Sequence, residues 1–178
     1  MAAVTGEGQG ETAARVVGDL RNALSQPTLD DAGAAMKQAF RKINSSLYQQ
    51  GMGDQTASAV ALVTRGKYAT IANIGEGRAC LMRAGRLNQV TRDITPTPLK
   101  SAKGKNAPAE EPKAVAPALL GTRERLDSRQ PAIYELTLLP EDRVLLCTAA
   151  VHRAMDEQAV LANLAGDDVE QSLALLKQ

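Results

Sequence analysis

The chain has 178 residues and a formal net charge of +1, from 21 basic and 20 acidic side chains, and 2% of its residues are aromatic. This length suits one domain over residues 1–178. The balanced charge excludes a basic surface that would attract nucleic acid, and the few aromatic side chains exclude a surface on which bases would stack. The sequence lacks both an apolar run of about 18 residues, which would span a bilayer, and an N-terminal signal core. We therefore expect a cytoplasmic protein with neither a nucleic-acid nor a membrane partner.

The first part of the chain is predicted to be mainly helical. A strand end at residues 1–4 leads into a glycine-rich turn at residues 5–10. Apolar side chains at helical spacing then predict two amphipathic helices, over residues 11–24 and 28–47. Thr28 and Asp31 fit a capping signal at the start of the second helix.

The middle of the chain is predicted to form strands. Apolar runs separated by glycine-containing turns lie at residues 57–64, 68–74, 78–82 and 87–91, and two more lie at 132–139 and 144–147. The run at 57–64 is apolar on both faces, as expected of a strand covered on both sides. The short turns between the first four runs predict an antiparallel meander.

Two further segments complete the organisation. Residues 94–118 contain five prolines and four lysines, which predicts a flexible loop, with its lysines either solvated or forming a docking patch. Near the end of the chain, Asp156 is a predicted helix cap, with Met155 and Val160 as its hydrophobic staple. A last helix is predicted around residues 169–176. Two helices, then antiparallel strands, then helices indicate an α+β fold with a sheet-on-sheet core.

Few residues carry reactive side chains. Cys80 and Cys147 each lie in an apolar strand pattern, which is typical of buried thiols that act as small hydrophobes. His152 is the only histidine, so no cysteine and histidine spacing fits a zinc site. Because no motif places a nucleophile beside it, we interpret His152 as a surface residue rather than a general base.

Several segments, in order, resemble motifs of the metal-dependent Ser/Thr protein phosphatases of the 2C type. They are VTGEGQGETAARVV at 4–17, GMGDQTASAVALVTRGKYATIANIGEGRACLMRAGRLNQVTRD at 51–93, LLGTRE at 119–124 and LTLLPEDRVLLCTAAVHRAMDEQAV at 136–160. The resemblance implies a four-layer α-β-β-α sandwich, truncated at both ends, as a single phosphatase 2C-like domain. It also implies that any metal site lies at one end of the sandwich.

The resemblance allows the family's metal-binding positions to be located here. In that family, Mg²⁺ or Mn²⁺ ions held by carboxylates activate a water that attacks phosphoserine or phosphothreonine. The family's Asp-Gly falls on Thr5 and Gly6, its Ser-Asp-Gly aspartate on Ala149, and its Gly-Asp-Ser-Arg acid on Glu76. One carboxylate cannot hold two metals, so we expect a degenerate site without catalytic residues, metal or cofactor.

The turn around Glu76 has a structural interpretation as well. Gly75 and Gly77 supply turn dihedrals, and Arg78 is predicted to pair with Glu76 or with a neighbouring acid. The turn would then keep the geometry of the fold without its chemistry.

Three functions stay open at the level of sequence. The first is a catalytically inactive phosphatase-like domain, a pseudophosphatase, that regulates or binds a protein partner, phosphorylated or not. The second is an active Mg²⁺- or Mn²⁺-dependent Ser/Thr phosphatase whose relocated site would gather Glu7, Asp54, Glu76 and Asp93. The third is a small-anion binder at the glycine-rich start of the first helix, which Glu7 and Glu11 disfavour by repelling phosphate.

The resemblance also bears on assembly. The family's sandwich has strands beyond both ends of this chain, and uncovered sheet edges pair with other chains. We therefore expect either a homodimer or a larger parent protein.

Overall fold

A computed structural model describes residues 2–8, 11–25, 31–49, 56–93, 119–121, 130–166 and 170. The elements in chain order are β1 (Ala2–Gly8), α1 (Thr12–Leu24), α2 (Ala32–Gln49), β2 (Ala57–Arg65), β3 (Tyr68–Ile74), β4 (Arg78–Arg83), β5 (Arg86–Gln89), β6 (Ala132–Thr137), β7 (Arg143–Cys147), α3 (Ala149–Ala154) and α4 (Glu157–Leu164). Of the predicted features, the loop at 94–118 and the last helix around 169–176 lie outside the described residues.

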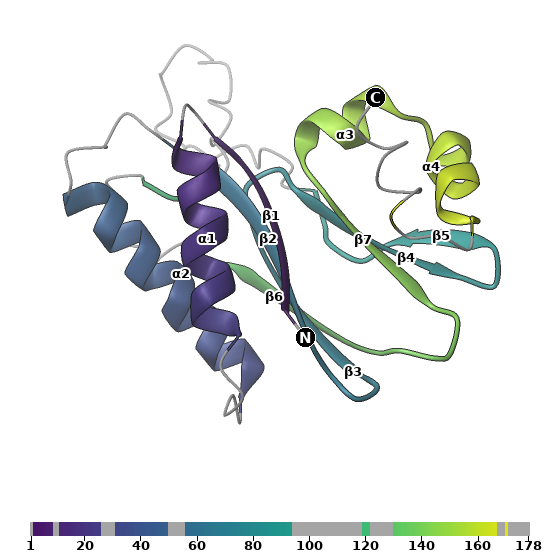
Figure 1. The fold of residues 1–178 in the computed structure, drawn as a ribbon, viewed down its shortest axis with the longest axis horizontal. Coiled ribbons are helices and arrows are strands. Elements are labelled where there is room, and N and C mark those ends of the chain that lie inside the picture. The colour runs from purple at the N-terminus through teal and green to yellow at the C-terminus, as the bar shows by residue number, and fades with distance from the viewer. Residues whose placement is uncertain are drawn as a thin grey trace, which may run out of the picture.

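The strands form two antiparallel sheets that stack face to face. The large sheet has the order β1-β2-β3-β6, and the small sheet has the order β5-β4-β7. Figure 1 shows α1 and α2 on the outer side of the large sheet, and α3 and α4 on the outer side of the small sheet. The described residues therefore form the predicted α+β sandwich of four layers.

The outer face of the large sheet forms one core with α1 and α2. Val16 and Leu20 of α1 and Met36 and Phe40 of α2 are fully buried there. These residues lie on the predicted apolar stripes of the two helices. Full burial of each such side chain stabilises the fold by roughly 1.5–3 kcal/mol, so this layer is strongly held.

A second core fills the space between the sheets. Val60 and Leu62 of β2 and Ile71 of β3 are buried there, and Leu146 of β7 packs against them. Because α1 and α2 cover the other face of β2, this strand is buried on both sides, which explains its apolar run. The backbone N–H of Arg92 also donates to the hydroxyl of Tyr134 at 3.0 Å, which ties the two sheets together.

The predicted glycine-rich turn at residues 5–10 is wrong over residues 5–8. β1 continues through Thr5 and Gly6, which pair with Val60 and Ala59 of β2. The reason is close packing, because a Cβ atom on Gly6 would lie 3.0 Å from the Ser58 carbonyl oxygen and 3.2 Å from Cγ2 of Val17. Glycine is needed here for helix and strand to approach, rather than for a turn.

The predicted meander is confirmed in its two outer pairings, β2 with β3 and β4 with β5, and wrong in the middle one, because β3 and β4 belong to different sheets. The segment at residues 75–77 carries the chain from the large sheet to the small one, across the end of β2. Gly75 has φ +86°, and a Cβ atom there would lie 2.4 Å from Cβ of Ser58. We call residues 75–77 the sheet crossing.

The helix starts test the predicted caps. α2 begins at Ala32, later than predicted, and the Asp31 carboxylate accepts a hydrogen bond from the Ala34 N–H at 2.9 Å. Asp31 is therefore the capping residue, and Thr28 lies outside the described residues. The cap at Asp156 is confirmed, since its carboxylate accepts from the Ala159 N–H at 2.7 Å.

The hydrophobic staple predicted beside Asp156 is likewise confirmed, because Met155 packs against the cluster that contains Val160. Among the described residues, no helix combines the length and apolar character needed to cross a bilayer.

Candidate functional site

The sequence places its candidate positions on three separate elements. Thr5 and Gly6 lie in β1, Glu76 is in the sheet crossing, and Ala149 is the first residue of α3. Val60 of β2 lies beside two of these elements. It pairs with Thr5 of β1, and its side chain packs so closely on Gly77 of the crossing that a Cβ atom there would lie 2.4 Å from Cγ2 of Val60. The crossing in turn contacts α3, as described next.

Glu76 is bound by the last turn of α3. Its carboxylate lies 2.7 Å from a guanidinium nitrogen of Arg153, and its backbone carbonyl oxygen lies 2.9 Å from Nε2 of His152. His152 is half-buried, so it lies at the surface as predicted, and one ring nitrogen also contacts the crossing. Both side chains of the ion pair are exposed, so we expect it to stabilise the fold by at most about 1 kcal/mol.

Arg78 pairs with Asp93, 15 residues further along the chain, rather than with Glu76. Its guanidinium donates to both carboxylate oxygens of Asp93, at 2.7 and 2.6 Å, and Gln89 donates to the same carboxylate at 2.8 Å. The hydrogen bond from Arg78 lowers the pKa of Asp93 and correspondingly raises the pKa of Arg78. This paired geometry is the strong, bidentate form of a carboxylate–guanidinium contact.

The two ion pairs border a surface pocket of about 300 Å³. Its lining consists of Gly75, Glu76, Gly77, Arg78, Asp93, His152 and Arg153. Each carboxylate in this pocket is matched by a guanidinium, so the pocket does not present a concentrated negative charge. We call it the charged pocket.

The residues at the four candidate positions do not fit a pair of hard divalent ions. Thr5, Gly6 and Ala149 carry no carboxylate, and the carboxylate of Glu76 is engaged by Arg153. Within the described ranges, no three His, Cys, Asp or Glu side chains lie close enough to hold a metal ion. Asp54, one of the acids of the relocated-site alternative, lies outside those ranges.

A second, smaller pocket, which was not predicted from sequence, lies on the outer face of the small sheet. It has a volume of about 140 Å³, and both cysteines line it together with Arg78 and His152, which it shares with the charged pocket. Side chains alternate between the two faces of a strand, so the sequence could have indicated that both cysteines point away from the core between the sheets. Only the register of β4 against β7 shows that the two thiols lie close together.

Comparisons with known proteins extend this description. No family model matches the chain, and no curated protein matches it. Solved structures do match. PppA, described as a key regulatory component of T6SS in Pseudomonas aeruginosa, has a TM-score of 0.74 and 21% identity over 98% of this chain and 78% of that chain.

Two structures of PstP agree with this result. The serine/threonine phosphatase PstP/Ppp of Mycobacterium tuberculosis has a TM-score of 0.71 and 20% identity, over 99% of this chain and 79% of that chain. The catalytic domain of PstP in complex with 2 manganese ions has a TM-score of 0.72 and 21% identity, over 99% and 78%. The chain therefore has the fold of the 2C-type Ser/Thr phosphatases, as its motifs predicted.

Proposed function

We propose that this protein is a phosphatase-fold regulator that binds protein partners, phosphorylated or not, and does not hydrolyse phosphate esters. The observation that carries this proposal is the ion pair between Glu76 and Arg153, at 2.7 Å. Glu76 is the only acid among the four candidate positions, and a guanidinium already neutralises it.

The physical argument rests on what a divalent ion needs from its site. Mg²⁺ and Mn²⁺ give up tightly held water only for several carboxylate or carbonyl oxygens. The methyl group of Ala149 and the hydroxyl of Thr5 do not offset that dehydration. The positive charge beside Glu76 comes from Arg153, a residue of α3, instead of from a bound metal ion.

The comparison with PppA supports a regulatory role, because that protein has this fold and is described as a regulatory component. The charged pocket is the surface through which we expect a partner to be recognised. It offers both guanidinium and carboxylate groups to the backbone and polar side chains of a bound segment.

The decisive experiment is a titration with Mn²⁺ and Mg²⁺ by calorimetry, read beside thermal melting and phosphopeptide hydrolysis. The PstP catalytic domain serves as the positive control, since it was solved with manganese. We expect no heat of binding at millimolar concentrations, no change in melting temperature and no release of phosphate.

An ion that binds, raises the melting temperature and drives phosphate release would instead establish the active-phosphatase alternative. Glu76→Ala would then be the first variant, because loss of binding in it would place the ion at the sheet crossing. Binding that survives this variant would place the ion among other carboxylates.

We also propose a second copy of the chain as a partner. Among the described strands, β1 and β6 of the large sheet and β5 and β7 of the small sheet each have a single neighbour, so each leaves one edge of its backbone unpaired. Such edges pair readily with other strands. Sedimentation equilibrium tests this, and a stable monomer at high protein concentration would contradict it.

A further inference from the structure

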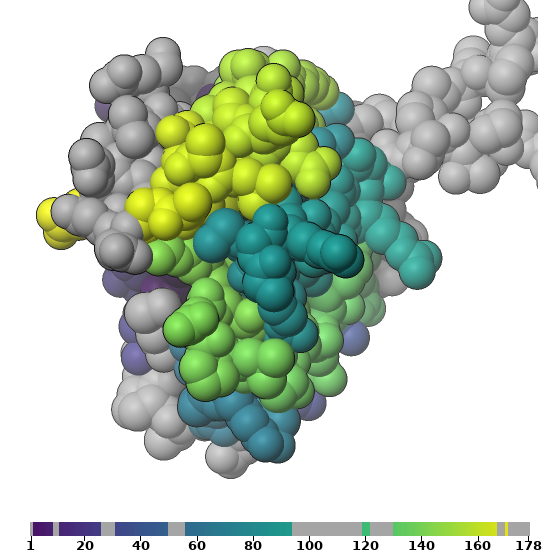
Figure 2. All heavy atoms as spheres, turned by 90° about the vertical axis from the view of Figure 1, so that its right-hand side faces the viewer, coloured from purple at the N-terminus to yellow at the C-terminus, as the bar shows by residue number. Residues whose placement is uncertain are grey.

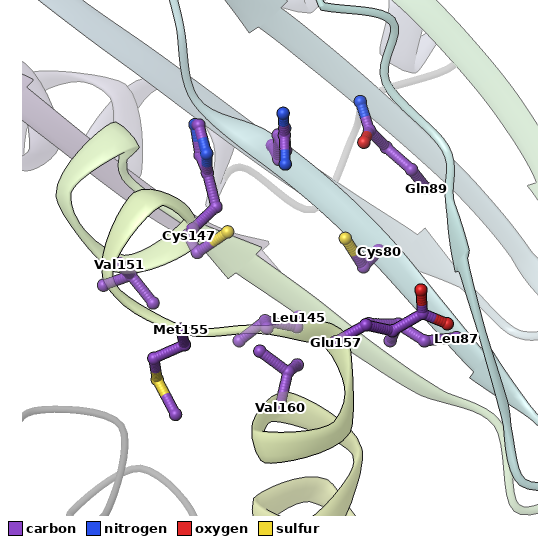
Figure 3. A pocket seen from close by; sticks show the side chains of 11 residues that line it. Cys80, Leu87, Gln89, Leu145, Cys147, Val151, Met155, Glu157 and Val160 are labelled. Atoms are coloured by element: carbon purple, nitrogen blue, oxygen red, sulfur yellow. The ribbon is translucent and has the colours of Figure 1, made fainter.

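The smaller pocket contains the only two thiols of the chain and places them on the same face of the small sheet. Cys80 comes from β4 and Cys147 from the neighbouring β7, and both side chains are nearly buried, at 8% and 5% exposure. Figure 3 shows the two sulfur atoms pointing toward one another into the pocket. We call this the thiol pocket.

The strand register fixes how far apart the two cysteines are. Cys80 is paired directly with Leu145, and Cys147 is paired with Arg78, so the cysteines are diagonal neighbours. Diagonal neighbours in an antiparallel pair have Cα atoms about 7–8 Å apart. A disulfide requires Cα atoms within about 6.8 Å, so direct S–S bonding would need the strands to move.

A single atom placed between the two sulfurs would span this diagonal. Thiolates prefer soft metals, and a monovalent, closed-shell cation such as Cu(I) is satisfied by two thiolates in a linear arrangement. Zinc is a poorer fit, because it requires at least three protein ligands, and no such group occurs within the described part of the chain. We propose that Cys80 and Cys147 form a two-coordinate site for a soft monovalent cation of the Cu(I) class.

Such a complex would carry a charge, and the thiol pocket is lined by charged groups of both signs. Binding would replace two S–H protons, released to solvent, with two S–Cu bonds, leaving one net negative charge on the bis(thiolate) unit. Burial is the largest influence on the pKa of both cysteines and raises it, Arg78 in the same pocket lowers it, and Glu157, which also lines the pocket, raises the pKa of Cys80. Apolar side chains line the pocket as well, with Leu145, Met155 and Val160 among them, and they lower the polarity around the sulfur atoms.

Burial makes the free thiols unreactive without such a cation. It raises the pKa of Cys80 to about 11 and also raises the pKa of Cys147, so both are protonated at neutral pH. A soft metal displaces those protons, whereas a peroxide needs a thiolate that is already formed. The pocket is thus better suited to a metal than to oxidation.

The test is a competition for Cu(I) between the reduced 178-residue chain and bicinchoninate, under anaerobic conditions with ascorbate present. We expect one Cu(I) per chain and the release of two protons for each Cu(I) bound. Cys80→Ser and Cys147→Ser should each weaken binding by on the order of 100-fold, because changes around a ligand alone cost about 10–100-fold. Leu87→Val, which alters the pocket wall without removing a donor, should leave the affinity unchanged.

Several outcomes would overturn the proposal. They are the absence of Cu(I) binding by the unmodified chain, retention of binding in the double serine variant, and preferential binding of zinc. Ready formation of an internal disulfide with oxidised glutathione would also overturn it, because the thiols would then be closer than the register implies. If the serine variants lose their fold, Cys80→Val and Cys147→Val, together with the proton release of the unmodified chain, still decide the question.

Discussion

At the scale of single residues, two glycines of the sheet crossing are fixed by the side chains they face. A Cβ atom on Gly77 would lie 2.4 Å from Cγ2 of Val60, and one on Gly75 would lie equally close to Cβ of Ser58. Real Cβ atoms do not approach other carbons so closely, so either the crossing or β2 would have to move. By contrast, a Cβ atom on Gly18 of α1 would meet nothing within 4 Å.

This contrast gives a matched pair of predictions. Gly77→Ala should destabilise the fold by about 1–3 kcal/mol, the usual effect of overpacking a filled core. Gly18→Ala should stabilise it by roughly 0.5–1 kcal/mol, because alanine is the better residue in a helix. Urea unfolding of both variants checks this, and equal effects of the two substitutions would show that the crossing relaxes freely.

At the scale of elements, an ion pair holds the turn between β6 and β7. The Asp142 carboxylate accepts hydrogen bonds from the Arg83 guanidinium of β4, at 2.9 and 2.6 Å, and from the Leu139 N–H at 2.7 Å. Arg83 is the larger cause, and Leu139 the smaller, of a pKa for Asp142 lowered from 3.8 to about 2. The turn is therefore tied to the hairpin of β4 and β5. Figure 2 shows the teal surface of β4 and β5 adjoining the green surface of β6 and β7.

The lowered pKa of Asp142 predicts a pH dependence of stability. A carboxyl group that is more acidic in the folded protein stabilises the fold fully above its unfolded pKa, and this contribution is lost as the pH falls through the folded value. For Asp142 the window runs from about pH 4 down to about pH 2. Asp142→Asn should flatten the dependence of the unfolding free energy on pH within this window.

Urea unfolding at a series of pH values measures that dependence. Arg83→Gln should flatten the same window, because it removes the principal partner of Asp142. If the unfolding free energy of both variants falls with pH as steeply as that of the unmodified protein, other carboxyl groups dominate acid unfolding.

The secondary elements were largely predictable from sequence, because helical spacing and apolar runs are local. The cap at Asp156 was predictable for the same reason. The sheet crossing was not, since glycine at positive φ is equally typical of a hairpin and of a change of sheet. The strand through Gly6 was missed because glycine is required there by close contacts with Val17 and Ser58. Those contacts form only in the folded chain and leave no local sequence pattern.

The contacts of the candidate positions were not predictable from sequence. Thr5, Glu76 and Ala149 were located by motif alone, and they stay predictions as site residues. The partner of Glu76 is Arg153, 77 residues away in the chain, and no local pattern indicates that pairing. The thiol pocket likewise depends on the register of β4 against β7, which is set by the whole small sheet.

At the scale of the whole molecule, the four layers are unequally buried. β2 is buried along most of its length, and α1 and α2 pack on it with fully buried side chains. β5 is mostly exposed, and α4 buries only Val160 and Leu164. Local unfolding of β5 and α4 therefore breaks fewer buried contacts than local unfolding of β2 or of the helices packed on it.

This inequality predicts two classes of amide hydrogen exchange. Amides of β2 and β3 should exchange only through global unfolding, whereas amides of β5 and α4 should exchange through smaller openings at lower free energy. Hydrogen exchange read by mass spectrometry, with denaturant below the unfolding transition, distinguishes the two. A single exchange free energy across both sheets would contradict the prediction.

The close approach of Val60 to Gly77 has a consequence for natural variation. A residue as large as valine at position 60 leaves room only for glycine at position 77. Where a related sequence has alanine at position 60, position 77 can accept a residue with a side chain. In sequences descended from the same ancestor, the sizes of these two residues should therefore covary inversely, and the length of the crossing should not change.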